Sequence, residues 1–409
     1  MPRLTRRRAW AIALVATFTM AISYVDRQTL SVLAPTVTAK LNIGEEAYGW
    51  LAAAFSLAYL IGAPVAGRAI DKVGARRGLL FAVLVWSVIA ASHALVPGFF
   101  ALFALRIALG FAEAPSFPGA AQTIHRVLPP ADRARGFGVL FTGSSIGAMI
   151  AAPLSTVLEA RFGFRGAFVG VAMLGGLVWI PLWLFVTSGA DARAVLDRTE
   201  QETKEPARPI SEVLLHPAVL RGIVLVLASA PVMAFLLLWG AKFLVAQHHL
   251  VQKDVGRYLW MPPLLYDLGS VAFGDLAARR KGSDSPRALL FTAMLLTCSI
   301  GALGLPKTPW GTTLLCGVAM AGGGGLFAIL TADMLARVPP NAVSLAGGLT
   351  AAAQSLAYIV ANPLIGRSVQ RTHTFAWATM SLAAWLVPGC VLWLLWKAPP
   401  IVRSSSDSS

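Results

Sequence analysis

Two adjacent charged residues, Asp26 and Arg27, interrupt an apolar stretch near the start of the chain, and Arg106 and Glu113 interrupt a later one. Both stretches are long enough to cross a membrane as helices, which takes about 20 residues. A charge at the centre of a membrane costs roughly 2.5 to 3.5 kcal/mol on insertion scales, so such residues face a protein interior or a wet cavity and usually carry function. We therefore expect these four charges to form the functional centre.

Helical spacing predicts which of these side chains point the same way. Arg106, Gly110 and Glu113 follow one another at intervals of four and three residues, so they share one helix face. Arg27 and Asp26 are turned from each other by about 100°, so we expect Arg27 to face a cavity and Asp26 to lie between helices. Two acids balance two arginines only while both acids are ionised, which suits a proton-dependent switch. A purely structural ion-pair network is the alternative.

Prolines follow the second acid of this set. Pro115 and Pro118 stand just after Glu113 and lack the backbone N–H that a helix needs. We expect the helix to bend beside Glu113.

The composition is that of an integral membrane protein. Hydrophobic residues make up 56% of the 409 residues, charged residues make up 13%, and the mean hydropathy is +0.68. The net charge of +15 is explained by basic loops beside a lipid bilayer and does not indicate nucleic-acid binding. Twelve apolar stretches are predicted as transmembrane helices, at 9–37, 47–70, 78–97, 98–126, 133–160, 164–188, 217–247, 254–279, 285–305, 309–338, 341–369 and 373–397.

A polar segment divides these twelve stretches six and six. Its mixed charges and missing apolar stripe predict a solvated linker, and a regulatory site is the alternative. We expect an N-terminal six-helix bundle at 1–188, a cytoplasmic linker at 189–216, a C-terminal six-helix bundle at 217–400 and a cytoplasmic tail at 401–409. Basic residues gather on one set of loops and at Arg6-Arg7-Arg8, which places both termini in the cytoplasm, with the first helix uncleaved.

The two halves contain an internal repeat. The segment Arg126-Val-Leu-Pro129-Pro130 recurs as Arg337-Val-Pro339-Pro340, and the next proline follows at the same distance in both copies, at Pro153 and Pro363. Two related six-helix halves that hold a substrate between them near the membrane midplane describe a secondary transporter of the rocking type.

The loop after the second stretch reads Gly67-Arg-Ala-Ile-Asp71-Lys-Val-Gly74-Ala-Arg76-Arg77. Gly67 permits close helix approach, Gly74 suits a tight turn, and Asp71 can cap a helix or pair with the arginines. This loop resembles the signature Gly-x-x-x-Asp-x-x-Gly-x-Arg-Arg of the major facilitator superfamily, which implies a cytoplasmic gate. An ordinary basic loop is the alternative, and the second-half counterpart at 274–281 has lost the spacing.

Longer motifs narrow the resemblance. Tyr-Val-Asp-Arg-x-x-Leu-Ser-Val at 24–32 and Arg-x-x-x-Gly-x-x-Glu-Ala-x-x-Phe-Pro at 106–118 are similar to the anion:cation symporter family. Trp239-Gly-Ala-Lys242-Phe-Leu and the Trp260-Met-Pro262 segment resemble its hexuronate branch. The resemblance implies an all-α membrane protein of twelve helices in two pseudo-symmetric halves, which carries hexuronates, aldonates or related organic anions.

The resemblance also implies roles for individual residues. Asp26 and Glu113 would be the protonated acids, Arg27 would bind the substrate carboxylate, and Arg106 would pair with an acid. The remaining substrate contacts would include hydrogen bonds from Tyr24 and Tyr59. Three further substrate contacts are our own predictions from residue type: Lys242, because a lysine inside a membrane is costly unless used, and the amides Gln354 and Asn362. Lys242 could instead extend to the interface, and the amides could be satisfied within the bundle.

The chain departs from the hexuronate-branch pattern at a few places. Gly240 and Ala241 replace Leu-Pro, Phe243 replaces tyrosine, Tyr266 stands where alanine is usual, and Gln354 lies in a Gly/Ala-rich stretch. These departures bear on which substrate the protein binds, and they leave the resemblance to the family unchanged.

We predict a proton-coupled symporter that imports an organic anion, such as a hexuronate or aldonate, by alternating access. Protons are the coupling ion, and we expect no enzyme activity, no other cofactor and no metal, since three cysteines and six histidines show no ligand spacing. A monomer in a bacterial inner membrane is expected. The alternatives are an exporter of drugs or other organic compounds, which two arginines and Lys242 argue against, and a non-transporting membrane sensor of organic acids.

Overall fold

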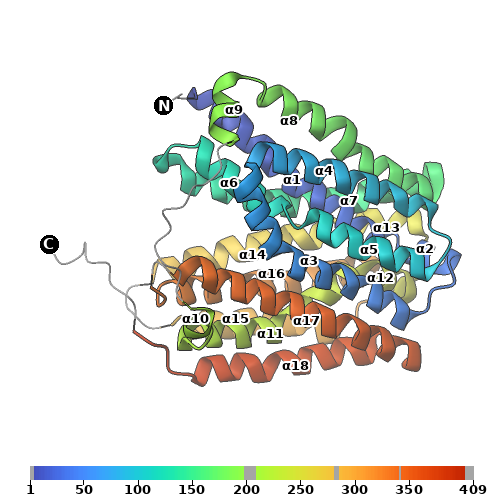
Figure 1. The fold of residues 1–409 in the computed structure, drawn as a ribbon. Coiled ribbons are helices and arrows are strands. Elements are labelled where there is room, and N and C mark those ends of the chain that lie inside the picture. The colour runs from blue at the N-terminus through green and yellow to red at the C-terminus, as the bar shows by residue number, and fades with distance from the viewer. Residues whose placement is uncertain (1–3, 198–208, 281–284, 340–341, 401–409) are drawn as a thin grey trace. The chain divides into compact units, whose positions relative to one another are not determined.

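A computed structural model describes residues 4–197, 209–280, 285–339 and 342–400 of the chain. All regular elements in these ranges are helices, and no strand occurs in them (Figure 1). The all-α prediction is therefore confirmed.

Contacts along the chain divide it into two compact units. The first unit comprises Met1–Gln201 and Leu237–Trp260, and the second comprises Glu202–Leu236 and Met261–Ser409. Each unit is described by itself. The sequence-based boundaries at 188 and 217 stay a prediction, and the tail at 401–409 and part of the linker lie outside the described residues.

The first unit contains most of the N-terminal helices and two short later ones. Its elements are α1 (Arg6–Val32), α2 (Ala34–Lys40), α3 (Glu45–Val73), α4 (Ala75–Ser92), η1 (His93–Leu95), α5 (Phe99–Glu113), α6 (Ser116–Val127), α7 (Pro130–Met173), η2 (Leu174–Trp179), α8 (Ile180–Val186), α9 (Ala190–Leu196), α12 (Gly240–His248) and α13 (Gln252–Leu259).

The second unit contains the remaining helices. Its elements are α10 (Ile210–Leu214), most of α11 (Pro217–Leu238), α14 (Met261–Ala278), α15 (Arg287–Cys298), η3 (Ser299–Ala302), α16 (Pro309–Leu335), α17 (Val343–Thr372) and α18 (Ala376–Leu395).

Nine helices of the described chain are long and apolar enough to span a membrane. One of them, Pro130–Val186, covers the two predicted spans at 133–160 and 164–188, and Gly163 interrupts it with a φ of 68°. The predicted spans at 217–247, 254–279 and 285–305 are each divided between shorter elements. Fewer helices than predicted spans are counted because one helix covers two spans and because the apolar helix at Arg287–Ala302 is shorter than the others.

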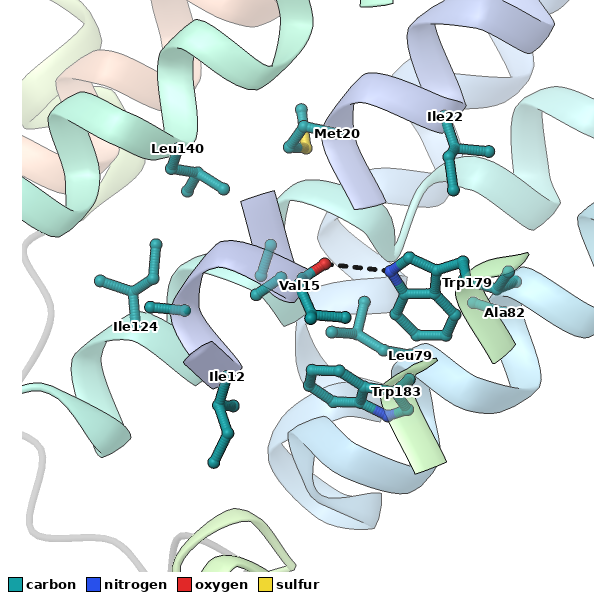
Figure 2. Packing of buried hydrophobic residues seen from close by; sticks show 14 of the residues in the cluster. Ile12, Val15, Met20, Ile22, Leu79, Ala82, Ile124, Leu140, Trp179 and Trp183 are labelled. Carbon is teal, nitrogen blue, oxygen red and sulfur yellow. Dashed lines mark hydrogen bonds between the residues drawn. The ribbon is translucent and has the colours of Figure 1, made fainter. Parts of the chain in front are cut away.

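The core of the first unit is built around stacked tryptophans. Trp179 and Trp183 have ring centroids 5.1 Å apart, and Trp179 Nε1 donates a hydrogen bond to the carbonyl oxygen of Val15 at 3.0 Å (Figure 2). A buried indole needs such a partner for its N–H group. Ala192 and Leu196 of α9 are buried in the same core, whereas Asp191, Arg193 and Ala194 of this helix are exposed.

Close helix packing brings the functional helices together. In the first unit, α1 packs along α7 and α3 packs along α5. A Cβ atom at Gly110 would lie 2.6 Å from the carbonyl oxygen of Phe55, so only glycine allows α5 to approach α3 this closely. Gly110 therefore allows the helix that carries Arg106 and Glu113 to pack closely against α3.

Candidate functional site

The predicted charges meet inside the first unit. Arg27 Nε donates to Glu113 Oε2 at 2.6 Å, and the Ser23 hydroxyl donates to the same oxygen at 2.8 Å. The Glu113 side chain is completely buried, and only 15% of the Arg27 side chain is exposed. The ion pair joins α1 to the last residue of α5 and is shielded from solvent, where such a contact is strongest.

Aromatic rings surround the Arg27 guanidinium. Its Cζ atom lies 4.4 Å from the ring centroid of Tyr59 and 5.0 Å from those of Tyr24 and Phe55. Guanidinium groups are attracted to ring faces at such distances. The structure thus places Tyr24 and Tyr59 beside Arg27, where both were predicted to contact a substrate.

Asp26 and Arg106 are buried without an ion pair. Their residues are 5% and 3% exposed, and the Arg106 guanidinium lies 4.8 Å from the Phe55 ring centroid. In the described part of the chain no acid lies within 4.0 Å of Arg106, so the predicted pairing of Arg106 with an acid is not observed. Asp26 nevertheless lies within electrostatic range of Glu113, Arg106 and Arg27.

Several atoms of this cluster retain hydrogen-bonding capacity. Arg27 Nη2, Arg106 Nε, Asp26 Oδ2 and Glu113 Oε1 are all buried and have no hydrogen-bond partner among the described residues. Buried polar groups in native proteins are almost always satisfied, so unsatisfied ones mark a strained or functional place. Two guanidinium nitrogens remain available to an anion, and two carboxyl oxygens remain available to protons.

The local sequence fixes the position of Glu113. Helix α5 ends at Glu113, and α6 starts again at Ser116 after a turn at Ala114 and Pro115. The bend predicted beside Glu113 is confirmed. The Glu113 carboxylate therefore lies at the end of a helix, where the series of backbone hydrogen bonds is interrupted.

Lys242 has two partners within the first unit. Its Nζ atom lies 2.9 Å from Glu45 Oε1 and 2.9 Å from the Thr38 hydroxyl, and it lies 5.2 Å from the Tyr48 ring centroid. The ammonium group therefore ties α12 to the ends of α2 and α3. Substrate binding by Lys242 stays a prediction.

The two predicted amides lie in the second unit and differ in environment. Asn362 is fully buried and donates to the Tyr358 carbonyl oxygen at 2.8 Å, so its own helix satisfies part of its amide. Gln354 lines a pocket with Tyr266, the aromatic departure from the hexuronate pattern. The departures Gly240 and Ala241 begin α12 directly after a break at Trp239.

The predicted gate loop lies between α3 and α4. Asp71 Oδ1 accepts a hydrogen bond from Gln122 Nε2 at 2.7 Å. Arg76 Nη1 and Arg77 Nε lie 3.5 and 3.9 Å from Asp197 Oδ2, just after α9. Gly74 adopts a φ of 88°, which confirms the tight turn.

Gly67 behaves differently from Gly74. A Cβ atom at Gly67 would meet no atom within 4 Å, so the close helix approach expected there is not observed. The loop is held by its contacts with α9 and α6 instead.

Sequence reasoning missed several of these partners. Asp197, Gln122 and Phe55 contact predicted site residues, but each lies far from its partner along the chain. Only Ser23 carried a signal, because it precedes Arg27 by one helical turn and shares its face.

The sequence pattern of the Major Facilitator Superfamily matches residues 16–362. The chain belongs to this superfamily. The match covers both units and includes the four membrane charges, the gate loop and the two amides.

Curated relatives of this facilitator carry names from the branch that the motifs predicted. This chain is 27% identical to the hexuronate transporter of Escherichia coli strain K12, over 100% of its own length and 98% of the relative's length. It is 26% identical to the galacturonate transporter of Dickeya chrysanthemi over 76% of the chain and 95% of the relative. The resemblance to the hexuronate and galactonate branch is therefore confirmed.

Solved structures confirm the fold. A bacterial homologue of the human lysosomal transporter Spinster has a TM-score of 0.79 at 16% identity and covers 96% of this chain and 97% of its own. The nucleoside transporter NupG has a TM-score of 0.76 at 13% identity, with 95% and 99% coverage. The facilitator is a multi-pass membrane protein of the major facilitator fold.

Proposed function

We propose that this facilitator is a proton-coupled symporter that imports a sugar acid, a hexuronate or aldonate, by alternating access. The observation that carries the proposal is the buried pair of Arg27 and Glu113, in which one nitrogen and one oxygen remain without partners among the described residues. The names of the relatives support the substrate class. Location in a bacterial inner membrane with cytoplasmic termini and a monomeric state are part of the same proposal.

The coupling follows from competition for one guanidinium group. While Glu113 is ionised, it accepts from Arg27 and Ser23 and neutralises the arginine. A proton on Glu113 removes that charge and leaves Arg27, inside its aromatic surroundings, with an unbalanced positive charge. A substrate carboxylate can then take the place of Glu113 with bidentate geometry. Loss of the proton restores the internal pair and expels the anion.

Asp26 and Arg106 extend this scheme. Both are buried and unpaired, and each retains an unsatisfied polar atom among the described residues. A proton on Asp26 would shift the balance further toward positive charge. Arg106 would then help to hold the anion or the second acid.

Transport into proteoliposomes tests the proposal. Wild-type protein is expected to accumulate galactonate or glucuronate when the outside is made acidic. Glu113→Gln, which cannot change its charge, is expected to lose proton-driven accumulation while it retains exchange of internal for external substrate. The exchange assay shows that the variant is folded and still moves substrate.

A matched control shows whether the loss of accumulation is specific to Glu113 or follows from the removal of any carboxylate. Asp191→Asn removes a carboxylate from the exposed side of α9 and should leave accumulation unchanged. Full accumulation by Glu113→Gln would remove Glu113 from the coupling step, and failure of the wild-type protein to move any sugar acid would overturn the proposed function.

A further inference from the structure

One aromatic ring of the first unit contacts both arginines of the site. The Arg27 Cζ atom lies 5.0 Å from the ring centroid of Phe55, and the Arg106 Cζ atom lies 4.8 Å from the same centroid. Both distances are within the roughly 6 Å over which a cation is attracted to the face of a ring. Phe55 belongs to α3, whereas the two arginines belong to α1 and α5, so one side chain connects three helices.

The surroundings of this ring exclude most of the solvent. Phe55 is 7% exposed, Arg106 is 3% exposed, and 15% of the Arg27 side chain is exposed. The face of an aromatic ring carries partial negative charge, which attracts a cation more strongly where little water competes. The Phe55 ring therefore partly compensates two buried positive charges that repel each other.

Packing determines where the ring lies. Tyr59, one helical turn further along α3, stacks on Phe55 with ring centroids 6.0 Å apart and an interplanar angle of 18°. Helix α5 packs against the Phe55 backbone, because a Cβ atom at Gly110 would lie 2.6 Å from the Phe55 carbonyl oxygen. The position of the ring is therefore set by its own helix and by α5.

The two arginines have few other partners. Arg27 donates to Glu113 through Nε, and its Nη2 atom has no hydrogen-bond partner among the described residues. Arg106 Nε likewise has no partner in the described ranges. Once a proton on Glu113 removes the charge that attracts Arg27, the aromatic rings remain to hold its guanidinium group.

We propose that Phe55 is a positioning residue of the transport site, whose ring holds the Arg27 and Arg106 guanidinium groups in the orientation that binds the substrate carboxylate. Phe55 acts through the arginines and does not itself touch the substrate. Its contact with Arg27 matters most while Glu113 is protonated, because a long arginine side chain without its carboxylate would otherwise occupy several rotamers. The inference rests on the proposed function and adds a residue to its anion-binding step.

The alternative role for Phe55 is apolar packing alone, since it also belongs to the hydrophobic core of the first unit. Packing depends on the size and shape of the ring, whereas attraction to the arginines depends on the negative charge of its face. The two roles therefore respond differently to fluorine atoms on the ring, which change its charge distribution more than its shape.

A fluorination series at Phe55 tests the inference. Phenylalanine analogues with one, two or three ring fluorine atoms are introduced by nonsense suppression, and each fluorine withdraws charge from the ring face and weakens cation binding. Isothermal titration of the purified full-length protein with galactonate at acidic pH gives the dissociation constant of each variant. We expect it to rise with every fluorine and to be about tenfold higher with three. A dissociation constant that stays the same along the series would overturn the inference.

The same trifluorinated analogue at Phe117 is the matched control. Phe117 on α6 contacts another aromatic ring, that of Phe141, with centroids 5.8 Å apart. Fluorination there should leave the dissociation constant for galactonate unchanged. An equal rise at both positions would show a general effect of fluorine and would overturn the role of Phe55.

An ordinary substitution covers the case in which the trifluorinated protein does not fold, judged by its melting temperature. Phe55→Leu keeps an apolar side chain but has no ring face, so it should raise the dissociation constant about tenfold. Phe55→Tyr restores a ring and should bind galactonate as the wild type does. Wild-type affinity in a folded Phe55→Leu would overturn the inference.

The failure of the inference differs from the failure of the proposed function. If the wild-type protein and every Phe55 variant bind galactonate equally well, the proposed function stands and the inference is overturned. If the wild-type protein binds no sugar acid, both are overturned.

Discussion

At the residue scale, the proposed function requires Arg27 to bind two anions in turn, first Glu113 and then the substrate. Arg27 Nε lies 2.6 Å from Glu113 Oε2, and the rings of Tyr24, Phe55 and Tyr59 lie 4.4 to 5.0 Å from the guanidinium carbon. Only the planar fork of arginine can offer parallel N–H donors to a carboxylate while it stacks on rings. The identity of the residue therefore matters beyond its charge.

Replacing Arg27 by lysine should show this. Arg27→Lys retains the positive charge but loses the bidentate geometry and the ring contacts, so we expect the affinity for galactonate to fall by about tenfold to a hundredfold, or about 1.4 to 2.8 kcal/mol. Isothermal titration of the purified variants measures the change.

The control for this substitution is Arg257→Lys, which changes the same side chain at an exposed position of α13. It should bind as the wild type does. Wild-type affinity in Arg27→Lys would show that Arg27 acts as a charge alone or does not touch the substrate.

The charged residues of this site could be predicted from the sequence, but their pairing could not. Asp26, Arg27, Arg106 and Glu113 are recognisable because charge inside an apolar stretch is costly. Helical spacing does not tell which acid meets which arginine, because that depends on how α5 lies against α1. The structure pairs Glu113 with Arg27, whereas the resemblance gave an acid partner to Arg106.

At the element scale, the turn between α3 and α4 depends on α9. The backbone of Gly74 is left-handed, and a Cβ atom there would lie 2.9 Å from Asp197 Cα and 2.9 Å from the Leu196 carbonyl oxygen. Arg126 also donates to that carbonyl oxygen at 3.2 Å. The segment after α8 thus docks on the predicted gate loop.

Two glycine substitutions in this region should have opposite effects. Gly74→Ala combines a disfavoured backbone conformation, which costs about 1 to 2 kcal/mol, with a clash against backbone atoms, so the melting temperature should fall. Gly67→Ala lies in helix α3 with open space around its Cβ atom and should leave the melting temperature unchanged or raise it slightly.

Thermal unfolding of both variants in detergent provides the comparison. A Gly74→Ala protein as stable as the wild type would show that α9 does not press on this turn. A strong loss of stability in Gly67→Ala would mean that this glycine is packed after all.

In the second unit, one acid anchors the ends of three helices. Asp333 near the end of α16 accepts from Arg221 at 2.6 Å and from Arg337 at 3.1 Å. Arg221 also donates to the Trp393 carbonyl oxygen near the end of α18 and lies 3.6 Å from the centre of its ring. Both arginines are buried, so Asp333 balances charge that has little access to water.

Removal of that acid should be costly. Asp333→Ala leaves two buried guanidinium groups without their carboxylate, and breaking a buried pair in this way costs about 3 to 5 kcal/mol. We expect a large fall in melting temperature or in the yield of folded protein.

The exposed pair of Asp275 and Arg279 is the matched control. Its atoms lie 2.7 Å apart, but 52% of the Asp275 side chain is exposed, so Asp275→Ala should change stability by less than about 1 kcal/mol. Similar losses in both variants would contradict the view that burial decides the effect.

The elements themselves were predictable to different degrees. The predicted bounds of the long apolar stretches lie close to those of α1, α3, α16 and α18, because a membrane helix needs a continuous apolar stretch. The breaks at Trp239 and Trp260 and the burial of α9 were not predictable, since they depend on packing between segments distant in sequence.

At the scale of the whole molecule, the internal repeat is visible in the structure of each unit. The first copy spans the end of α6 and the start of the long helix α7, and the described part of the second copy, Arg337 to Pro339, lies between α16 and α17. The arginine that begins each copy has different contacts: Arg126 donates to the Leu196 carbonyl oxygen, and Arg337 donates to the Asp333 carboxylate. Pseudo-symmetry therefore extends to the order of helices but not to the chemistry at their ends.

The four membrane charges of the coupling scheme all lie in the first unit. The proposed proton coupling and carboxylate binding therefore depend on side chains of that unit.

The pH dependence of galactonate binding tests the central claim most directly, because Glu113 and the substrate are proposed to compete for Arg27. We predict that wild-type affinity, measured by isothermal titration, rises as the pH falls, by up to about tenfold for each pH unit per proton taken up. Glu113→Gln should bind more tightly at high pH and show a shallower dependence, with Asp26 as the remaining acid. An affinity that does not change with pH, or the same slope in both proteins, would contradict the account.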